Sequence, residues 1–447
     1  MHTTQGARLA LAISALVSSV VIARPMTTLQ QLQQQQQQQL TFNVPQQDDT
    51  LITFNVDSLF ESSSFNQLSP RDQVQLRQYV AQSPEPRLVQ LDSFDAAPIS
   101  ITEGHKALLT LQGINFIDVT DDPTNSFASV YSNNKSKGPT YPKKLKLKLR
   151  HLQHVYNSID QQRMMTFITK FTSFRTRHYK SDTGKQSQQF LLQTIKDIVN
   201  KGNNIDDMTK SSNVTVREFS HPWGQNSIIV RFEPDSSTVI DERIVILGAH
   251  QDSTNLLPWF AAPGADDDGS GTTTLVTTLR ALIEFGFKPS DHAVEIHFYS
   301  AEEGGLLGSQ AVAQSYAQQG KQVLGMLQQD MTSYVKPGTQ PVIGIIRDFV
   351  NPELTDYISL VVDEFCSIGR VETQCGYACS DHASWSKIGA PSAFAIESKF
   401  EDSNKQIHSS GDTIQNVGFS IDHVEQFVRL SIALAVNLGG AKSFVKL

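Results

Sequence analysis

The sequence predicts an α/β protein with a mostly parallel, twisted sheet covered by helices on both faces. From about residue 151, short apolar runs rich in β-branched residues alternate with longer stretches of helical periodicity. The 447 residues are 39% hydrophobic, which is enough for one large domain and a smaller segment. Acidic and histidine side chains follow the ends of the apolar runs, where doubly wound sheets form their binding crevice.

The expected elements follow in chain order. Strands are predicted at residues 244–247, 293–299, 323–327 and 392–396. Helices are predicted at residues 270–287, 306–319, 352–365 and 421–437, the first of them ending near Gly286. No internal repeat interrupts this alternation. It is the pattern of parallel strands joined by covering helices.

The first residues are typical of a secretory signal. Arg8 is followed by an uncharged run of small and apolar residues, 9–22, that ends before Ala23. A membrane anchor is the alternative, but the run is shorter than the roughly 20 residues that a span needs. We therefore expect residues 1–23 to be a signal peptide and the protein to be secreted.

Residues 24–138 are expected to be a pro-segment, and residues 139–447 the catalytic domain. The pro-segment begins with a glutamine tract at 30–39, which cannot bury a core and is predicted to be disordered. The Lys/Leu alternation at 143–150 is either a processing region or a solvated edge strand, and we favour the strand.

Cysteine usage, glycosylation triplets and charge agree with an extracellular protein. Cys375 and Cys379 lie four residues apart, which favours a disulfide in an oxidising compartment; a metal site is the alternative. Asn134 and Asn213 begin candidate glycosylation triplets. The net charge of −8 argues against nucleic acid or an anionic membrane as the main partner. We expect a monomer.

Side chains suited to metal binding lie close to the predicted strand ends. They are His250 and Asp252, the acidic run 266–268, Glu302 and Glu303, Asp330 and His408. Two imidazoles and three carboxylates are a donor set that catalytic zinc accepts. One carboxylate has two oxygens and can bridge two ions, which together supply hydroxide at neutral pH.

Each of these motifs has a simpler interpretation when taken alone. The acidic run is typical of a turn before a helix, with Ser270 as the N-cap. Glu302 and Glu303 alone are typical of a solvated loop. His297 is interpreted as a core histidine, and His382 ranks below His408 as a ligand. Only the ordered set makes the metal hypothesis strong.

The ordered motifs resemble the secreted two-zinc leucine aminopeptidases of bacteria and fungi, which have the zinc exopeptidase fold. The similarity runs from about Thr166 to the C-terminus. It rests on residues 171–181 (FTSFRTRHYKS), 248–253 (GAHQDS), 263–271 (PGADDDGSG), 300–306 (SAEEGGL), 329–332 (QDMT), 375–385 (CGYACSDHASW) and 407–413 (IHSSGDT).

The resemblance implies a role for each matching residue. Asp267 would bridge two zinc ions, with His250 and Asp330 completing one site and Glu303 and His408 the other. Glu302 would be the general base and acid.

It also implies supporting residues. Asp252 would orient the His250 ring, and Asp268 would support the site after a cis peptide bond from Asp267. A Cys375–Cys379 disulfide would hold the loop that carries Tyr377 near the substrate carbonyl.

The resemblance places the pocket for the substrate side chain at Met331, Cys379, Ile396 and Phe400. Ile396 and Ser403 stand where relatives often have aromatic rings, so the pocket is expected to be reshaped.

The expected activity is removal of N-terminal residues, with large apolar ones such as leucine preferred. A carboxypeptidase, an amidohydrolase or a glutaminyl cyclase on the same scaffold is the alternative enzyme. A catalytically silent binding domain would lack a ligand or Glu302, and all are present.

Overall fold

The structure of the protein is a computed structural model. It describes residues 41–44, 52–91, 96–133, 138–145, 147–203, 214–234 and 242–440. The predicted signal peptide, the glutamine tract, Asn134 and Asn213 lie outside these residues. The chain divides into two compact units, Met1–Asn55 and Val56–Leu447. In the first unit, β1 (Thr41–Val44) and β2 (Ile52–Asn55) form an antiparallel pair.

The second unit is built on an eight-stranded sheet in the order β12-β11-β13-β10-β8-β9-β7-β6. Its central strands β13, β10, β8 and β9 are parallel to one another, whereas β6, β7 and β11 make antiparallel pairs towards the edges. The strands are β6 (Val214–Phe219), β7 (Ser227–Phe232), β8 (Ile244–His250), β9 (Ala293–Tyr299), β10 (Val323–Gln329), β11 (Val342–Ile346), β12 (Gly369–Thr373) and β13 (Ser392–Ile396).

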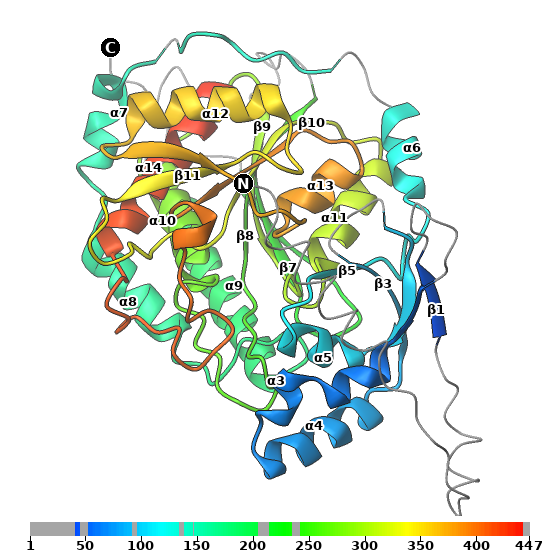
Figure 1. The fold of residues 1–447 in the computed structure, drawn as a ribbon. Helices are drawn as coiled ribbons and strands as arrows, with labels where there is room; N and C mark the ends of the chain where they lie inside the picture. Colours follow the sequence, from blue (N-terminus) through cyan, green and yellow to red (C-terminus); the bar gives the residue numbers. More distant parts are fainter. Residues whose placement is uncertain are drawn as a thin grey trace, which may run out of the picture. The chain divides into compact units, whose positions relative to one another are not determined.

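Helices cover both faces of this sheet (Figure 1). One layer, which includes the long α10 and α14, contains α7 (Leu149–Tyr156), α8 (Gln161–Phe171), α9 (Asp182–Asn203), α10 (Gly269–Glu284), α12 (Pro352–Phe365) and α14 (Ile421–Gly439). The other contains α6 (Ser126–Asn133), α11 (Leu307–Gln318) and α13 (His382–Lys387). A short 3-10 helix, η2 (Phe400–Asp402), follows β13.

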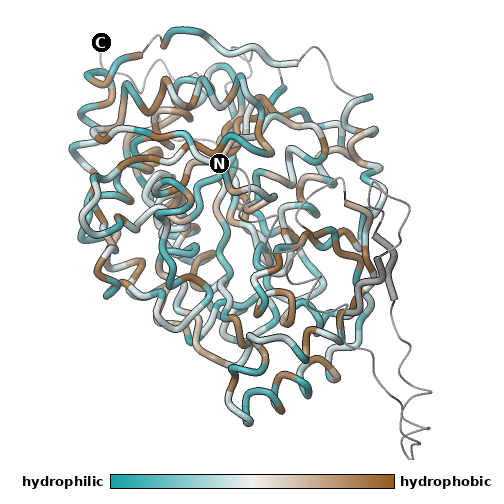
Figure 2. Tube along the Cα trace, viewed as in Figure 1, coloured by the Kyte–Doolittle hydropathy of each residue, from teal (hydrophilic) through white to brown (hydrophobic). Residues whose placement is uncertain are grey.

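The sheet separates the two largest hydrophobic clusters of the described residues. Strands β8, β9 and β10 are buried along their whole length, as expected for parallel strands between two helical layers. Hydrophobic and hydrophilic residues both occur along the covering helices (Figure 2). The buried hydrophobic residues of these helices pack in the same clusters as the residues of the strands.

Residues Val56–Asn133 add a smaller substructure to the second unit. Its antiparallel sheet has the order β4-β3-β5. Its elements are η1 (Val56–Glu61), α3 (Ser63–Asn66), α4 (Pro70–Gln82), β3 (Pro86–Leu91), β4 (Ile99–Thr102), α5 (His105–Leu111) and β5 (Phe116–Asp118), followed by α6. It packs against the loop after β9, where the backbone N–H of Asp118 donates to the carbonyl of Gly305.

The predicted α/β architecture is confirmed. Strands β9 and β13 and helix α12 have the predicted bounds, whereas β8 and β10 extend further, to His250 and Gln329. The antiparallel edge strands were not predicted. No described helix has the length and apolar character that a membrane span requires.

Two local predictions are wrong. The N-cap of α10 is Asp268, whose carboxylate accepts from the Gly271 N–H, and not Ser270, which donates to the Asp266 carbonyl. In the described part of residues 143–150 there is no strand, and α7 begins at Leu149. The alternating leucines pack against the core without a partner strand, because burial alone satisfies an apolar side chain.

Candidate metal centre

A first group of metal donors gathers at the carboxyl ends of the central strands. His250 is the last residue of β8, Asp330 directly follows β10, and Asp267 lies in the turn before α10. His250 Nε2 lies 3.0 Å from Asp267 Oδ1 and 3.5 Å from Asp330 Oδ1. The three donor atoms are close enough to one another to hold a single ion.

A second group shares Asp267 with the first. His408 Nε2 lies 3.1 Å from Asp267 Oδ2 and 3.0 Å from Glu303 Oε2. Asp267 therefore offers one carboxylate oxygen to each group, which is the arrangement of a bridging ligand between paired ions.

The residues present fit a metal. His250 Nε2, Glu303 Oε1 and Asp330 Oδ1 are buried, and none of them has a hydrogen-bond partner among the described residues. Buried polar atoms are almost always satisfied, so donors left over at one point indicate a ligand. Two imidazoles with three carboxylates suit zinc, whose coordination by nitrogen and oxygen leaves an open position in catalytic sites.

The electrostatics of the site reflect this crowding of carboxylates. Burial lowers the pKa of His250, but Asp330, Asp252 and Asp267 outweigh it and raise that pKa well above its usual value. Burial raises the pKa of Glu303 to about 6 despite the nearby His408. Burial also raises the pKa of Glu302 well above its usual range. A cation would relieve the cost of placing these carboxylates together.

Asp252 and Asp268 lie next to the candidate metal donors. Asp268 accepts backbone hydrogen bonds from His250 (3.1 Å) and Met331 (3.2 Å) in addition to the cap of α10, and its peptide bond from Asp267 is cis. Asp252 accepts from the N–H groups of Glu302 (3.1 Å) and Glu303 (3.3 Å), and its Oδ1 lies 3.5 Å from His250 Nδ1. Histidines that bind metals commonly have a carboxylate near their second ring nitrogen.

Uncommon backbone conformations aim several of these side chains. Ala301, Met331 and His408 have φ of 57°, 56° and 55°, in the left-handed region that non-glycine residues rarely occupy. Ala301 precedes Glu302, Met331 follows Asp330, and His408 is itself a candidate metal donor. Such conformations cluster at functional sites, where the surrounding structure enforces them.

Two supporting residues were missed by the sequence analysis. Arg177 is fully buried, and its guanidinium donates to the carbonyls of Gln251 and Gly264 at 2.9 Å each, and to that of Pro263. It thereby fixes the loop that leads from β8 to Asp267. The Ser380 hydroxyl donates to Asp330 Oδ2. Both lie within motifs that we had recognised, but only long-range contacts reveal their roles.

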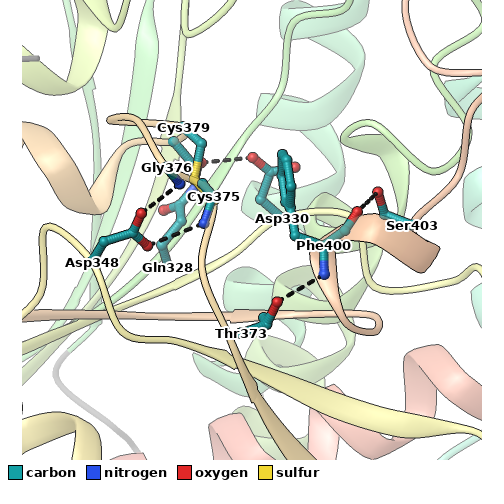
Figure 3. The surroundings of a disulfide bond; sticks show 10 residues. Gln328, Asp330, Asp348, Thr373, Cys375, Gly376, Cys379, Phe400 and Ser403 are labelled. Carbon is teal, nitrogen blue, oxygen red and sulfur yellow. Dashed lines mark hydrogen bonds between the residues drawn. A yellow bond between two sulfur atoms is a disulfide. The ribbon is translucent and has the colours of Figure 1, made fainter. Parts of the chain in front are cut away.

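An apolar cluster lies beside Asp330. Met331 and Ile396 are buried in it, and Tyr377 and Phe400 border it with ring centroids 6.0 Å apart. The predicted disulfide between Cys375 and Cys379 is present, and its loop lies next to Asp330 and Phe400 (Figure 3).

The residues around the disulfide loop support its position. Asp348 accepts backbone hydrogen bonds from Cys375 and Gly376, which anchors the loop from outside. Burial raises the pKa of the Tyr377 phenol, and the charges of Glu302 and Asp267 raise it further.

The histidines outside the metal groups have structural places. His297 is buried in the sheet, with Nε2 2.7 Å from Glu295 and Nδ1 3.0 Å from the Tyr299 hydroxyl, as a core histidine should be. His382 is buried in α13 against Phe394 and belongs to neither donor group of the described residues.

A mostly parallel sheet with paired metal donors at its carboxyl ends defines a metal-dependent hydrolase of the α/β class. The sequence profile of peptidase family M28 matches residues 227–434. Leucine aminopeptidase 1 of Chaetomium globosum is 44% identical over 76% of this chain and 82% of its own length. Leucine aminopeptidase 1 of Neurospora crassa is 43% identical over 78% of this chain and 84% of its own length.

Solved structures agree in fold. The LapA aminopeptidase of Legionella pneumophila is 23% identical and superposes with a TM-score of 0.66 over 80% of this chain and 99% of its own. LapB of the same organism gives 22% identity and a TM-score of 0.64 over 82% and 98%. The chain belongs to peptidase family M28 and is a metallo-aminopeptidase. Its substrates are peptides.

Proposed function

We propose that the protein is a secreted aminopeptidase that uses two zinc ions to remove large apolar N-terminal residues, such as leucine, from peptides. The observation that carries the proposal is the placement of Asp267, which offers Oδ1 to His250 and Oδ2 to His408. A carboxylate with one oxygen towards each donor group would bind one ion through each oxygen, which supports a pair of ions.

The chemistry requires an activated water and a group that moves its proton. Bound zinc would lower the pKa of water towards neutrality and polarise the scissile carbonyl. Glu302 takes the proton from the attacking water and returns it to the leaving amine. Tyr377 would donate a hydrogen bond to the developing oxyanion.

The restriction to a free N-terminus would follow from the metal pair. The free α-amine of the substrate would bind beside one zinc and an acidic group, and an acylated N-terminus could not make the same contacts. The first side chain then enters the apolar cluster of Met331, Ile396 and Phe400, where burial favours leucine and similar residues.

Secretion and a pro-segment complete the proposal. Residues 1–23 form the signal peptide, residues 24–138 the pro-segment and residues 139–447 the catalytic domain, which acts as a monomer. The disulfide supports an oxidising compartment. Asn134 and Asn213 would then be open to glycosylation. The boundary near 138 falls between the end of α6 and the start of α7.

Contacts of the N-terminal substructure support its role as a pro-segment. The Lys106 ammonium donates to the Gly304 carbonyl at 3.1 Å, directly after the ligand Glu303. The Tyr179 hydroxyl donates to Glu103 at 2.8 Å. A small cavity of about 40 Å³ is lined by Glu303 and by residues of this substructure, including Tyr79 and Phe116. Removal of the N-terminal substructure would open that side of the metal centre.

Hydrolysis of leucine-p-nitroanilide and of its N-acetyl derivative tests the proposal. We expect the free amine to be cleaved, the acetylated compound to resist, and a zinc chelator to abolish the activity. Equal cleavage of both compounds would exclude an aminopeptidase, and full activity after chelation would exclude the metal.

A further inference from the structure

Asp412 occupies a position that no role assigned so far explains. It is only 1% exposed and follows His408 by four residues, at the end of the same loop. Its carboxylate accepts the backbone N–H of Asp266, at 3.1 Å to Oδ1 and 3.2 Å to Oδ2. It also accepts the backbone N–H of Asp267, at 3.0 Å to Oδ2.

Further hydrogen bonds join the loop that carries Asp412 to the turn before α10. The carbonyl of Asp412 accepts from the Ala265 N–H at 3.1 Å, so three consecutive peptide groups of the turn before α10 bind this one residue. The Asn404 side chain donates to Asp412 Oδ1 at 3.3 Å. Asn404 is in turn held through its backbone N–H by the buried Glu397.

Helix capping does not account for these contacts. Helix α10 starts at Gly269, and its cap is Asp268, so the N–H groups of Asp266 and Asp267 precede the helix. What the contacts do fix is the peptide from which the Asp267 side chain projects. They fix it to the loop of His408, whose Nε2 lies 3.1 Å from Asp267 Oδ2.

We propose that Asp412 is a positioning residue that locks the loop of Asp267 to the loop of His408, so that the bridging carboxylate and the His408 imidazole meet at one metal ion. The inference rests on the proposed two-zinc function. Groups that orient metal ligands typically change metal affinity about 10- to 100-fold when they are removed. Loss of Asp412 should weaken mainly the zinc site formed by Asp267, Glu303 and His408.

Zinc titration of the full chain tests this inference. Asp412→Asn replaces one acceptor oxygen with an amide donor that faces the turn N–H groups. Asp422→Asn, at the start of α14, is the matched control, because its carboxylate contacts Gln161 away from the metal donors. Both variants and the wild type are stripped of metal and titrated with zinc against a competing chelator, and thermal unfolding of each metal-free form reports its fold.

We expect the wild type and D422N to bind two ions, and D412N to bind one of them about 10- to 100-fold more weakly, while metal-free D412N still unfolds in one cooperative transition. A general loss of structure would instead weaken both sites and remove that transition. The double variant D412N/H408A should bind zinc at the weakened site with the same affinity as H408A alone. The effects of two residues that act as a unit are not additive.

Two outcomes separate the inference from the function beneath it. A wild-type chain that binds no zinc overturns both. If the wild type binds two ions and D412N binds both of them with wild-type affinity, the inference is overturned and the two-zinc function stands. If D412N does not fold, Asp412→Glu keeps the charge and displaces the carboxylate by one methylene group. Wild-type affinity in a folded D412E would also overturn the inference.

Discussion

The Ser380 hydroxyl donates a 2.6 Å hydrogen bond to Oδ2 of Asp330, so a serine of the disulfide loop orients a candidate metal ligand. Two residues further along, His382 turns into the core against Phe394. The segment that looks like a nucleophilic or metal-binding motif thus contributes its serine to the site, and its histidine to the packing of α13.

Replacing histidines separates ligands from core residues. His408→Ala should lower the zinc content from two ions to one or none, because His408 contacts both Asp267 and Glu303. His382→Gln should retain both ions, although the variant should be less stable because the substitution is in the buried core. Metal analysis after dialysis against a weak chelator measures this. Loss of zinc in H382Q together with full zinc in H408A would reverse the assignment.

Glu302→Gln should remove the proton carrier and leave the metal donors intact. We expect kcat to fall by about 10²–10⁴-fold, the usual range for general acid–base catalysis. Zinc content should stay at the wild-type value, because Glu302 belongs to neither donor group. Steady-state kinetics with leucine-p-nitroanilide, combined with metal analysis, checks both parts. A variant that loses zinc would show that Glu302 is a ligand.

Ile396→Ala should widen the apolar cluster beside Asp330 and shift preference from leucine towards phenylalanine. A change of this size in a hydrophobic pocket alters the ratio of kcat/KM values by about 10- to 200-fold, corresponding to about 1–3 kcal/mol. Ile343→Ala is the control, since Ile343 is buried in the main core and not in this cluster. An equal shift in both variants would point to general loosening.

Acid should weaken the attachment of the N-terminal substructure. Burial alone raises the pKa of Glu103, but Lys106 and Lys180 outweigh it and lower that pKa from 4.5 to about 2. Because the folded pKa is depressed, the stabilisation is complete above pH 4.5 and is lost as the pH falls towards 2. By linkage it amounts to roughly 3 kcal/mol as an order of magnitude.

Thermal unfolding of the wild type and Glu103→Gln between pH 7 and pH 3 tests this dependence. The wild type should lose stability more steeply below pH 4.5 than E103Q, which cannot titrate at that position. Lys106→Met should also flatten the curve, since it removes the first of the cations that hold Glu103 ionised. Parallel curves for all three proteins would contradict the role of Glu103.

Much of the metal centre could be predicted because its residues are tied to strand ends. Parallel strands direct their carboxyl ends to one edge, so His250, Glu303 and Asp330 had to converge once their strands were placed. The long apolar strands and helices could be predicted because the periodicity of hydrophobic residues within a short segment reflects which side chains are buried.

The antiparallel edges were missed for a corresponding reason. Strand β12 is exposed or half-buried over most of its length, so no apolar run marks it. The Lys/Leu alternation at 143–150 gave the opposite error. Its period of two is typical of a strand, but the described part of this segment contains none. Pairing of edge strands depends on neighbours and not on local composition.

The sequence by itself determined the fold class, the identity of the metal donors and their order along the chain, because these follow from hydrophobic periodicity and side-chain chemistry. Only the tertiary structure decided that Asp267 faces both histidines, that Arg177 is buried beneath the β8 loop, and that Asp412 binds the turn before α10. The contacts of Arg177 with Gly264 and of Asp412 with Asp267 join residues 87 and 145 positions apart in the chain. Their geometry is set by the packing of whole loops, which no local pattern encodes.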